Sequence, residues 1–567
     1  MESTTGLRFE PMDMLARSEQ KLIESLVRDL PLRGLDLAAL LTAFLANEDT
    51  RGRLAALQSR FYREWLRLWT NPAQVPRTAA ADRRFQSPEW DQLPWFRFLL
   101  AQYELFSDYL IGLAELPTLE PRLQRRLRFV IRHLVDALAP TNYPASNPEV
   151  VKAAIGSRGE TLARGLQRLK ADLARGRISM TDESAFEVGR NLAVTPGEVI
   201  FENEVMQLIQ YRPATPEVFE RPLLVIPPFI NKYYVLDLQP DNSFARFCVE
   251  RGFTTCMVSW RNIPPQLGHL SWDDYIAKGV LEPLDVVRDV GAGKPVSTLG
   301  FCVGGTLLAC ALAVLAAHRR SGVCSLTLLA SMLDFSDTGE ISVYVDRDYV
   351  QWCEREYGSG GVIPGTRLAA AFATLRANDL IWYFVVNNYL LGRDPKPFDL
   401  LYWNADGSNL PGPLYAYYLR NMYLENNLRV GGRLRMQGVP VDLSRITLPA
   451  LVFAARDDHI VPWRTAYESA RLLGGRTEFV LGGSGHVGGV VNPPSRNQRQ
   501  HWINAELPAD PDDWLAAAQM HGGSWWNHWS QWLAKRSGAR RPAPASPGSS
   551  RFRPIEAAPG RYVREHC

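Results

Sequence analysis

Residues 296–305 read VSTLGFCVGG, and this stretch places one cysteine, Cys302, at a sharp turn of the chain. Val296 to Leu299 is a short apolar run of the kind that forms a buried strand. The residues that follow, TLLACALAVLAAHRR, are rich in alanine and leucine and predict a helix. Glycines on both sides of the cysteine allow strand and helix to approach closely, so the turn lifts Cys302 clear of the sheet. A thiol held there is either inert or a nucleophile.

Further apolar runs lie on both sides of Cys302 and alternate with helical or loop segments. They are VIFENEVMQLIQY, RPLLVIPP, TTCMVSW, SLTLLASM, PALVFAARDD and RTEFVLGG. Strands that alternate with helices indicate a mostly parallel sheet covered on both faces. Within such a sheet, a strand, a G-x-C-x-G turn and a helix have the layout of the nucleophile elbow of α/β-hydrolases, whose central residue is normally serine. The sequence therefore predicts an α/β protein with the α/β-hydrolase fold.

The pattern along the chain predicts additional units around this fold. We expect a variable N-terminal segment over residues 1–75, a mostly helical N-terminal domain over 76–197 and the catalytic domain over 198–567. Within the catalytic domain, residues 333–445 lack strong strand signals and are rich in aromatics, which indicates a cap or lid. Residues 536–552, RSGARRPAPASPGSSRF, have little to bury and predict a flexible segment.

Two segments each allow two interpretations. PRLQRRLRFVIRHL, at 121–134, concentrates arginines that form either a solvated helix face or an interaction surface. HGGSWWNHWSQWL, at 521–533, is an aromatic stripe that belongs either to the core or to a surface anchor.

Composition excludes several classes of function. A net charge of +3 favours neither a nucleic acid nor a strongly acidic partner. The longest apolar run, LLACALAVLAA, is far shorter than the roughly 20 residues of a membrane span. The N-terminal residues lack the apolar core of a secretory signal, and seven cysteines without a CxxC pair suit reduced thiols and no zinc site. We therefore expect a cytoplasmic protein without a transmembrane segment or a metal.

The order of an α/β-hydrolase triad is nucleophile, acid, histidine, and two loops downstream of Cys302 fit it. In ARDDHIVPW a predicted strand ends in a D-x-x-V-P pattern that selects Asp458 as the acid, with His459 beside it in a supporting role. In GGSGHVGGVVNPP a glycine-rich loop presents His486. We therefore predict that Cys302, Asp458 and His486 form a catalytic triad.

The surroundings of the nucleophile predict how it would act. Cys302 begins a helix, whose partial positive charge favours thiolate, and His486 can take the proton. The oxyanion donors are expected to be the backbone N–H of Val303 and that of Ile230, in the loop after VIPP. A cysteine that attacks a thioester keeps the acyl group activated, which suits repeated acyl transfer to a hydroxyl better than hydrolysis.

Several motifs together resemble those of polyhydroxyalkanoate synthases. They are LGFCVGGT, INKYYVLDLQP, TDESAFEVGRN, FDLLYWN, LPGP, DDHIVPW, GGSGHVGGVVNPP, GSWW and APGRYV. The resemblance runs from about residue 80 to the end, and the chain is similar to the class I enzymes, which act without a second kind of subunit. It implies polymerisation of (R)-3-hydroxyacyl-coenzyme A, typically 3-hydroxybutyryl-CoA, into a polyester stored as cytoplasmic granules.

The resemblance also implies roles for the triad and for partners. Cys302 is the acylated nucleophile, His486 is its base, and Asp458 orients His486 or helps to deprotonate the incoming 3-hydroxyl. Coenzyme A is a leaving group, and no bound cofactor is expected. The expected partners are the growing polyester chain, the granule surface and a second copy in a homodimer, with no nucleic acid.

Three positions depart from the pattern of related synthases. Phe229 stands in PPFIN where some class I relatives have cysteine, and Leu414 and Tyr417 stand where relatives often have tryptophan.

Two other functions remain open. A thioesterase or lipase-like hydrolase on the same fold would release free hydroxy acid, and a non-catalytic granule-binding protein would lack the triad.

Overall fold

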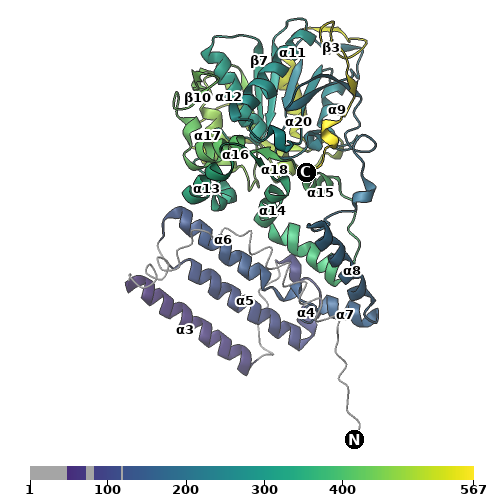
Figure 1. The fold of residues 1–567 in the computed structure, drawn as a ribbon. Coiled ribbons are helices and arrows are strands. Elements are labelled where there is room, and N and C mark those ends of the chain that lie inside the picture. Colours follow the sequence, from purple (N-terminus) through teal and green to yellow (C-terminus); the bar gives the residue numbers. More distant parts are fainter. Residues whose placement is uncertain (1–47, 72–81, 117–118) are drawn as a thin grey trace. The chain divides into compact units, whose positions relative to one another are not determined.

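The computed structural model describes residues 48–71, 82–116 and 119–567, so most of the variable segment predicted over 1–75 lies outside the described residues. The chain divides into two compact units (Figure 1). The first contains the chain up to Asp182 together with Ala370–Pro397, and the second contains Glu183–Ala369 and Phe398–Cys567. The division after Asp182 falls earlier in the chain than the boundary expected after residue 197.

The first unit is helical, as expected for this part of the chain. Its helices are α3 (Glu48–Thr70), α4 (Glu89–Gln92), α5 (Pro94–Ala114), α6 (Pro121–Ala137), α7 (Pro148–Gly156) and α8 (Glu160–Arg175). α6 begins at a proline, and the side chain of Glu120 accepts the N–H groups of Arg122 and Leu123. Such caps fix where a helix starts, because they satisfy donors that have no partner within the helix. The arginine-rich α6 is not uniformly solvated, since Arg126 is buried and Arg128 pairs with Glu115.

The segment Ala370–Pro397 packs within this helical unit, although the sequence placed it in the cap. It contains two π-helical turns, η10 (Asn378–Trp382) and η11 (Val385–Leu390). Tyr389 shares an apolar cluster with Leu169 of α8. Gly165 of α8 lies so close to the backbone of Tyr389 that an added Cβ would be 1.8 Å from its carbonyl oxygen. A glycine is therefore required where the segment crosses α8.

The second unit is built on an eleven-stranded sheet in the order β15-β14-β13-β12-β7-β6-β4-β5-β2-β1-β17. Strands β13, β12, β7, β6, β4 and β5 are parallel, and antiparallel strands extend both sides. The bounds are β1 (Gly197–Glu202), β2 (Met206–Tyr211), β4 (Leu223–Ile226), β5 (Thr255–Trp260), β6 (Val296–Phe301), β7 (Val323–Leu329), β12 (Ala450–Ala455), β13 (Thr477–Gly482), β14 (Gln500–Asn504), β15 (Gln519–Gly522) and β17 (Glu556–Ala557). The apolar runs of the sequence correspond to β1, β2, β4, β5, β6, β7, β12 and β13, and the central strands from β13 to β5 are parallel as predicted. The whole sheet is mixed and not mostly parallel, because five of its ten strand pairings are antiparallel.

Burial explains why the central strands read as continuous apolar runs. Every residue of β5, β6 and β12 is buried, as expected when helices cover both faces of a sheet. α12 (Val303–Ala317) is buried at thirteen of its fifteen residues, in keeping with its alanine- and leucine-rich composition. Other helices of this unit are α9 (Phe244–Glu250), α10 (Trp272–Ile276), α11 (Glu282–Val290), α17 (Trp463–Arg471), α18 (His486–Val490), α19 (Pro511–Ala517) and α20 (Trp525–Ala534).

The cap region has helices and only two-residue strands, in line with its weak strand signals. Its main elements are α13 (Arg347–Tyr357), β8 (Val362–Ile363), α14 (Gly365–Leu375), α15 (Asp399–Ala405), β9 (Leu410–Pro411), α16 (Gly412–Tyr418), the π-helical turn η12 (Leu419–Leu424), β10 (Arg435–Met436) and β11 (Val439–Pro440).

The aromatic stripe at 521–533 belongs to the core. Trp525, Trp526 and Trp529 of α20 are almost completely buried. The indole N–H groups of Trp525 and Trp526 donate to the carbonyls of Gly489 and Val490, at 2.9 and 2.8 Å. These hydrogen bonds fix the end of α18, the helix that begins at His486.

The structure differs from the flexible segment expected over residues 536–552. Arg540–Pro542 forms β16, which pairs with β3 (Glu217–Phe219). Further along, Gly548 donates its N–H to the Gln210 side chain at 2.7 Å. Main-chain hydrogen bonds hold this segment although it has few apolar side chains to bury.

Candidate active site

Cys302 occupies the turn between β6 and α12 that the sequence predicts. It has a φ of 53° and a ψ of −129°, a conformation that costs a non-glycine residue energy and is held only by its surroundings. Its N–H donates to the carbonyl of Leu329 at 2.9 Å. The thiol is half-buried at the carboxyl edge of the sheet. This is the geometry of a nucleophile elbow.

The glycines of the motif allow this turn to close. A Cβ added to Gly300 would lie 2.4 Å from the Cα of Gly305. A Cβ on Gly304 would lie 2.4 Å from the carbonyl oxygens of Ile226 and Pro227. These contacts are too short for any side chain, so G-x-C-x-G is a packing requirement of the elbow.

The structure brings Asp458 and His486 together in a buried pair. Nδ1 of His486 lies 2.7 Å from Oδ2 of Asp458. Oδ1 of Asp458 accepts the backbone N–H groups of Ile460 and Val461, at 2.8 and 2.9 Å. The carboxylate is therefore fixed by three hydrogen bonds, whereas the adjacent Asp457 is exposed.

The charges around His486 favour its protonated form. Burial opposes the charged ring, yet the negative charges of Asp458 and Cys302, with a hydrogen bond to each, raise the pKa of His486 well above its usual value. Because Nδ1 is bound to Asp458, Nε2 is left for the Cys302 thiol. The ring of Phe301 stacks on the imidazole with centroids 5.5 Å apart, which holds its plane. A cysteine, a histidine and a carboxylate so arranged can pass a proton from the thiol to the imidazole.

His486, and not His459, is the histidine that the Asp458 carboxylate binds. His459 follows Asp458 in the same turn and is half-buried, and its carbonyl packs against Gly339. The carboxylate of Asp458 is bound to His486. His459 is therefore next to the acid in the sequence without being the histidine that the acid orients.

The predicted oxyanion donors lie on two different elements. Val303 is the first residue of α12, where N–H groups lack partners within the helix. Ile230 lies in the loop after β4, and its carbonyl accepts the N–H of Ser408 at 3.0 Å. The next residue, Asn231, forms a β-bridge with Gly407. The loop that carries Ile230 is therefore paired with the cap.

Comparisons with known proteins identify the family. Residues 81–248 match the family model "Poly-beta-hydroxybutyrate polymerase (PhaC) N-terminus", and residues 222–493 match "alpha/beta hydrolase fold". The "Poly(3-hydroxyalkanoate) polymerase subunit PhaC" of Cupriavidus necator is 48% identical over 520 residues, which cover 90% of this chain and 88% of that protein. The chain belongs to the poly(3-hydroxyalkanoate) polymerase family.

Other members of the polymerase family match at lower identity. The Rhizobium meliloti protein of the same name is 38% identical, over 87% of this chain and 81% of its own. "Poly(3-hydroxyalkanoate) polymerase 1" of Ectopseudomonas oleovorans is 38% identical, over 85% of this chain and 86% of its own. The family resemblance and the α/β-hydrolase fold predicted from the sequence are confirmed.

Two cap tyrosines that the sequence did not single out lie near the nucleophile of this polymerase family member. Tyr418 is buried and Tyr423 is half-buried, and their rings are perpendicular with centroids 5.2 Å apart. Burial raises the pKa of both, and the charge of Cys302 adds to the effect. The available signal was the aromatic run PGPLYAYYLRNMYLEN, which does not say which ring faces the thiol.

A buried lysine beside the oxyanion loop was also missed. Lys232 is 1% exposed, and its ammonium donates to the carbonyl of Glu565. Burial lowers its pKa, although the charges of Asp406 and Glu565 oppose this. The Lys232 carbonyl accepts the indole N–H of Trp403 at 2.7 Å, and Asp406 accepts the hydroxyl of Tyr234 at 2.8 Å. The loop next to the nucleophile is thus tied to cap residues and to the last residues of the chain.

Of the three departures from related synthases, Phe229 and Leu414 are buried and Tyr417 is half-buried. Phe229 is buried against the rings of Trp260, Trp272 and Tyr275. Leu414 is fully buried, and Tyr417 stacks on Trp272 with centroids 6.0 Å apart.

Within the described ranges, no group of three or more histidine, cysteine, aspartate or glutamate side chains could hold a metal ion. No helix of the described part is long and apolar enough to cross a membrane.

Proposed function

We propose that this chain polymerises (R)-3-hydroxyacyl-CoA, with 3-hydroxybutyryl-CoA as the preferred substrate, into polyhydroxyalkanoate with release of CoA. The observation that carries the proposal is the cysteine at the elbow beside the His486–Asp458 pair, in a chain of the polymerase family. The growing polyester is carried as a thioester on Cys302.

In the first half-reaction, His486 takes the thiol proton of Cys302, and the sulfur attacks the thioester carbonyl. The N–H groups of Val303 and Ile230 stabilise the negative oxygen of the tetrahedral intermediate. The intermediate collapses as the carbon–sulfur bond to CoA breaks, and His486 returns the proton to the departing thiolate. The products are acyl-Cys302 and free CoA.

In the second half-reaction, the 3-hydroxyl of another acyl-CoA attacks the Cys302 thioester. His486 takes the hydroxyl proton as the carbon–oxygen bond forms, and it returns this proton to the sulfur of Cys302 as the carbon–sulfur bond to Cys302 breaks. The lengthened chain, now on CoA, is reloaded onto Cys302 by thioester exchange. Each monomer added forms one ester bond and releases one CoA thiol, without consuming water.

The use of cysteine in place of serine follows from this cycle. Exchange of one thioester for another is nearly balanced in energy, so the chain stays activated until a hydroxyl takes it. A serine ester would have almost the same energy as the ester to be made. Asp458 holds His486 in the tautomer that both half-reactions require.

The remaining aspects of the proposal follow the resemblance to class I synthases. We place the enzyme in the cytoplasm, at the surface of polyhydroxyalkanoate granules, as a homodimer without a second kind of subunit. Coenzyme A takes part as the leaving group of the substrate, and no cofactor is needed by the cycle.

The test is to mix purified protein with 3-hydroxybutyryl-CoA and to follow CoA release and turbidity together. We expect both to rise in wild type and both to be lost in Cys302→Ala. Cys324→Ala, at another half-buried thiol, is the matched control and should retain activity. Free 3-hydroxybutyrate appearing in step with CoA, without polymer, would instead identify a thioesterase.

A further inference from the structure

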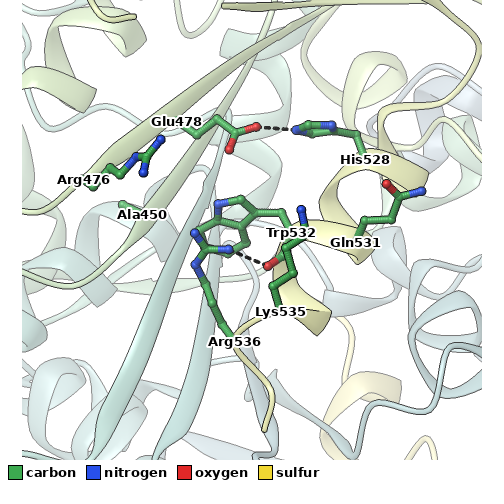
Figure 2. Close-up of a pocket in the computed structure, with 8 residues that line it drawn as sticks. All are labelled: Ala450, Arg476, Glu478, His528, Gln531, Trp532, Lys535 and Arg536. Atoms are coloured by element: carbon green, nitrogen blue, oxygen red, sulfur yellow. Dashed lines mark hydrogen bonds and ion pairs between the residues drawn. The ribbon is translucent and has the colours of Figure 1, made fainter. Parts of the chain in front are cut away.

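A small cavity lies at the end of the sheet opposite the triad. Figure 2 shows the side chains that line it. β12 and β13 run parallel, and Asp458 and His486 follow their carboxyl ends. The cavity lies at their amino ends, since Ala450 begins β12 and Arg476 directly precedes β13. Six residues of strand span about 20 Å, so the cavity is separate from the active site.

The side chains that line the cavity carry more positive than negative charge. The volume of the cavity is about 240 Å³, and three cationic side chains line it: Arg476, Lys535 and Arg536. The one carboxylate in the lining, Glu478, is bound to His528, as the dashed line in Figure 2 marks. Among the described residues, none of the three cations forms an ion pair. The lining therefore has an excess of positive charge that the protein does not neutralise.

One of these cations is held in place. The guanidinium of Arg536 lies 4.1 Å from the centre of the Trp532 ring and donates to the Trp532 carbonyl at 2.7 Å. Burial and the charge of Arg476 lower the pKa of Arg536, although Glu478 opposes this. Like charges thus face one another across the cavity, and an anion between them would relieve the repulsion.

We propose that this cavity binds a phosphate group, either as free orthophosphate or as the phosphate of a phosphomonoester. Three cations and the Glu478 carboxylate give the lining a net charge of +2, which a phosphate dianion balances in full and a single carboxylate only by half. Guanidinium groups match the oxygens of phosphate in pairs, and a lysine adds a mobile point charge. The cavity volume equals the volume that about eight water molecules occupy in liquid water. This is enough for a phosphate group and part of the alcohol that carries it.

The test measures binding of potassium phosphate and of glycerol 1-phosphate to the full chain by calorimetry, in a phosphate-free buffer at constant ionic strength. The test variant is Arg476→Gln/Lys535→Gln, which spares the half-buried Arg536 that packs on Trp532. The matched control is Arg433→Gln/Arg553→Gln, which removes the same two charges from exposed positions elsewhere. We expect both phosphate ligands to bind saturably to wild type and to the control variant. The Kd of each ligand should be at least about tenfold higher for the test variant than for wild type, because charged hydrogen bonds to the phosphate are lost.

The two ligands distinguish the source of the phosphate. Equal affinities mean that the site recognises the phosphate alone, and tighter binding of glycerol 1-phosphate means that the ester carbon chain is also contacted. Circular dichroism of both variants checks that each is folded. The proposal is overturned by an absence of saturable binding in wild type, by equal losses in test and control variants, or by succinate binding as tightly as phosphate.

Discussion

Replacing Asp458 by asparagine removes one charge from the triad while keeping the size of the side chain. Oδ1 of Asp458 accepts the N–H groups of Ile460 and Val461, so asparagine must keep its carbonyl oxygen there. Its amide NH₂ then faces Nδ1 of His486 and donates where the carboxylate accepts. His486 is left with its proton on Nε2, the nitrogen that has to accept the proton of Cys302.

The expected loss differs between the two half-reactions. Where a histidine must take a proton from a hydroxyl, this kind of substitution costs about 10⁴ in rate, or about 5.5 kcal/mol. Free cysteine is already about 3% ionised at pH 7, so a thiol nucleophile needs base catalysis less and acylation should lose about 30-fold at most. Elongation should therefore fall at least about 300-fold further than the first acylation.

Rapid-quench measurement of one-turnover CoA release gives the acylation rate, and polymer mass at steady state gives elongation. Asp457→Asn is the matched control, because it makes the same change one residue away at an exposed carboxylate. We expect the control to stay within about twofold of wild type. Equal defects at the two positions, or an acylation rate that falls as far as elongation, would refute the assignment of Asp458.

Three further expectations follow from the site. His486→Ala should abolish labelling of the nucleophile in a single turnover while His459→Ala costs far less, and the reverse order would exchange their roles. Gly304→Ala should destabilise the fold by about 1–3 kcal/mol in urea unfolding, because its Cβ would lie 2.4 Å from the carbonyl of Ile226; an unchanged midpoint would contradict this. The pKa of His486 is higher in the folded protein than in the unfolded chain. Protonation of His486 therefore stabilises the folded protein fully below about pH 6.5, the usual pKa of histidine, and this stabilisation is lost as the pH rises through the higher pKa of the folded protein. The free energy of unfolding should then fall more steeply above about pH 6.5 in wild type than in His486→Gln, and equal slopes would count against the raised pKa.

The parts of the fold that sequence could predict are those fixed by local patterns. The strand, the glycines and the helix around Cys302 specify one turn, because each constrains a few consecutive residues. The loops of Asp458 and His486 each follow an apolar strand, and parallel strands bring their carboxyl ends to one edge of the sheet. The order of the motifs was therefore enough to place the three residues near one another.

The parts that sequence could not predict depend on contacts between distant segments. Ala370–Pro397 reads as part of the cap, but the close crossing of Gly165 and Tyr389 assigns it to the helical unit. Residues 536–552 read as flexible, yet main-chain pairing with β3 holds part of them, and side-chain composition does not report such pairing. In the same way, a run of cap aromatics does not reveal that Tyr418 and Tyr423 lie near the nucleophile.

The central claim is that the acyl chain is carried by the sulfur of Cys302. Wild-type protein mixed with 3-hydroxybutyryl-CoA, quenched in acid within one turnover and digested with pepsin, allows the adduct to be located by tandem mass spectrometry. The account predicts a 3-hydroxybutyryl group on Cys302 that neutral hydroxylamine removes and that is absent from Cys302→Ala. An acyl group on any other residue, or CoA release with free hydroxy acid and no adduct, would contradict it.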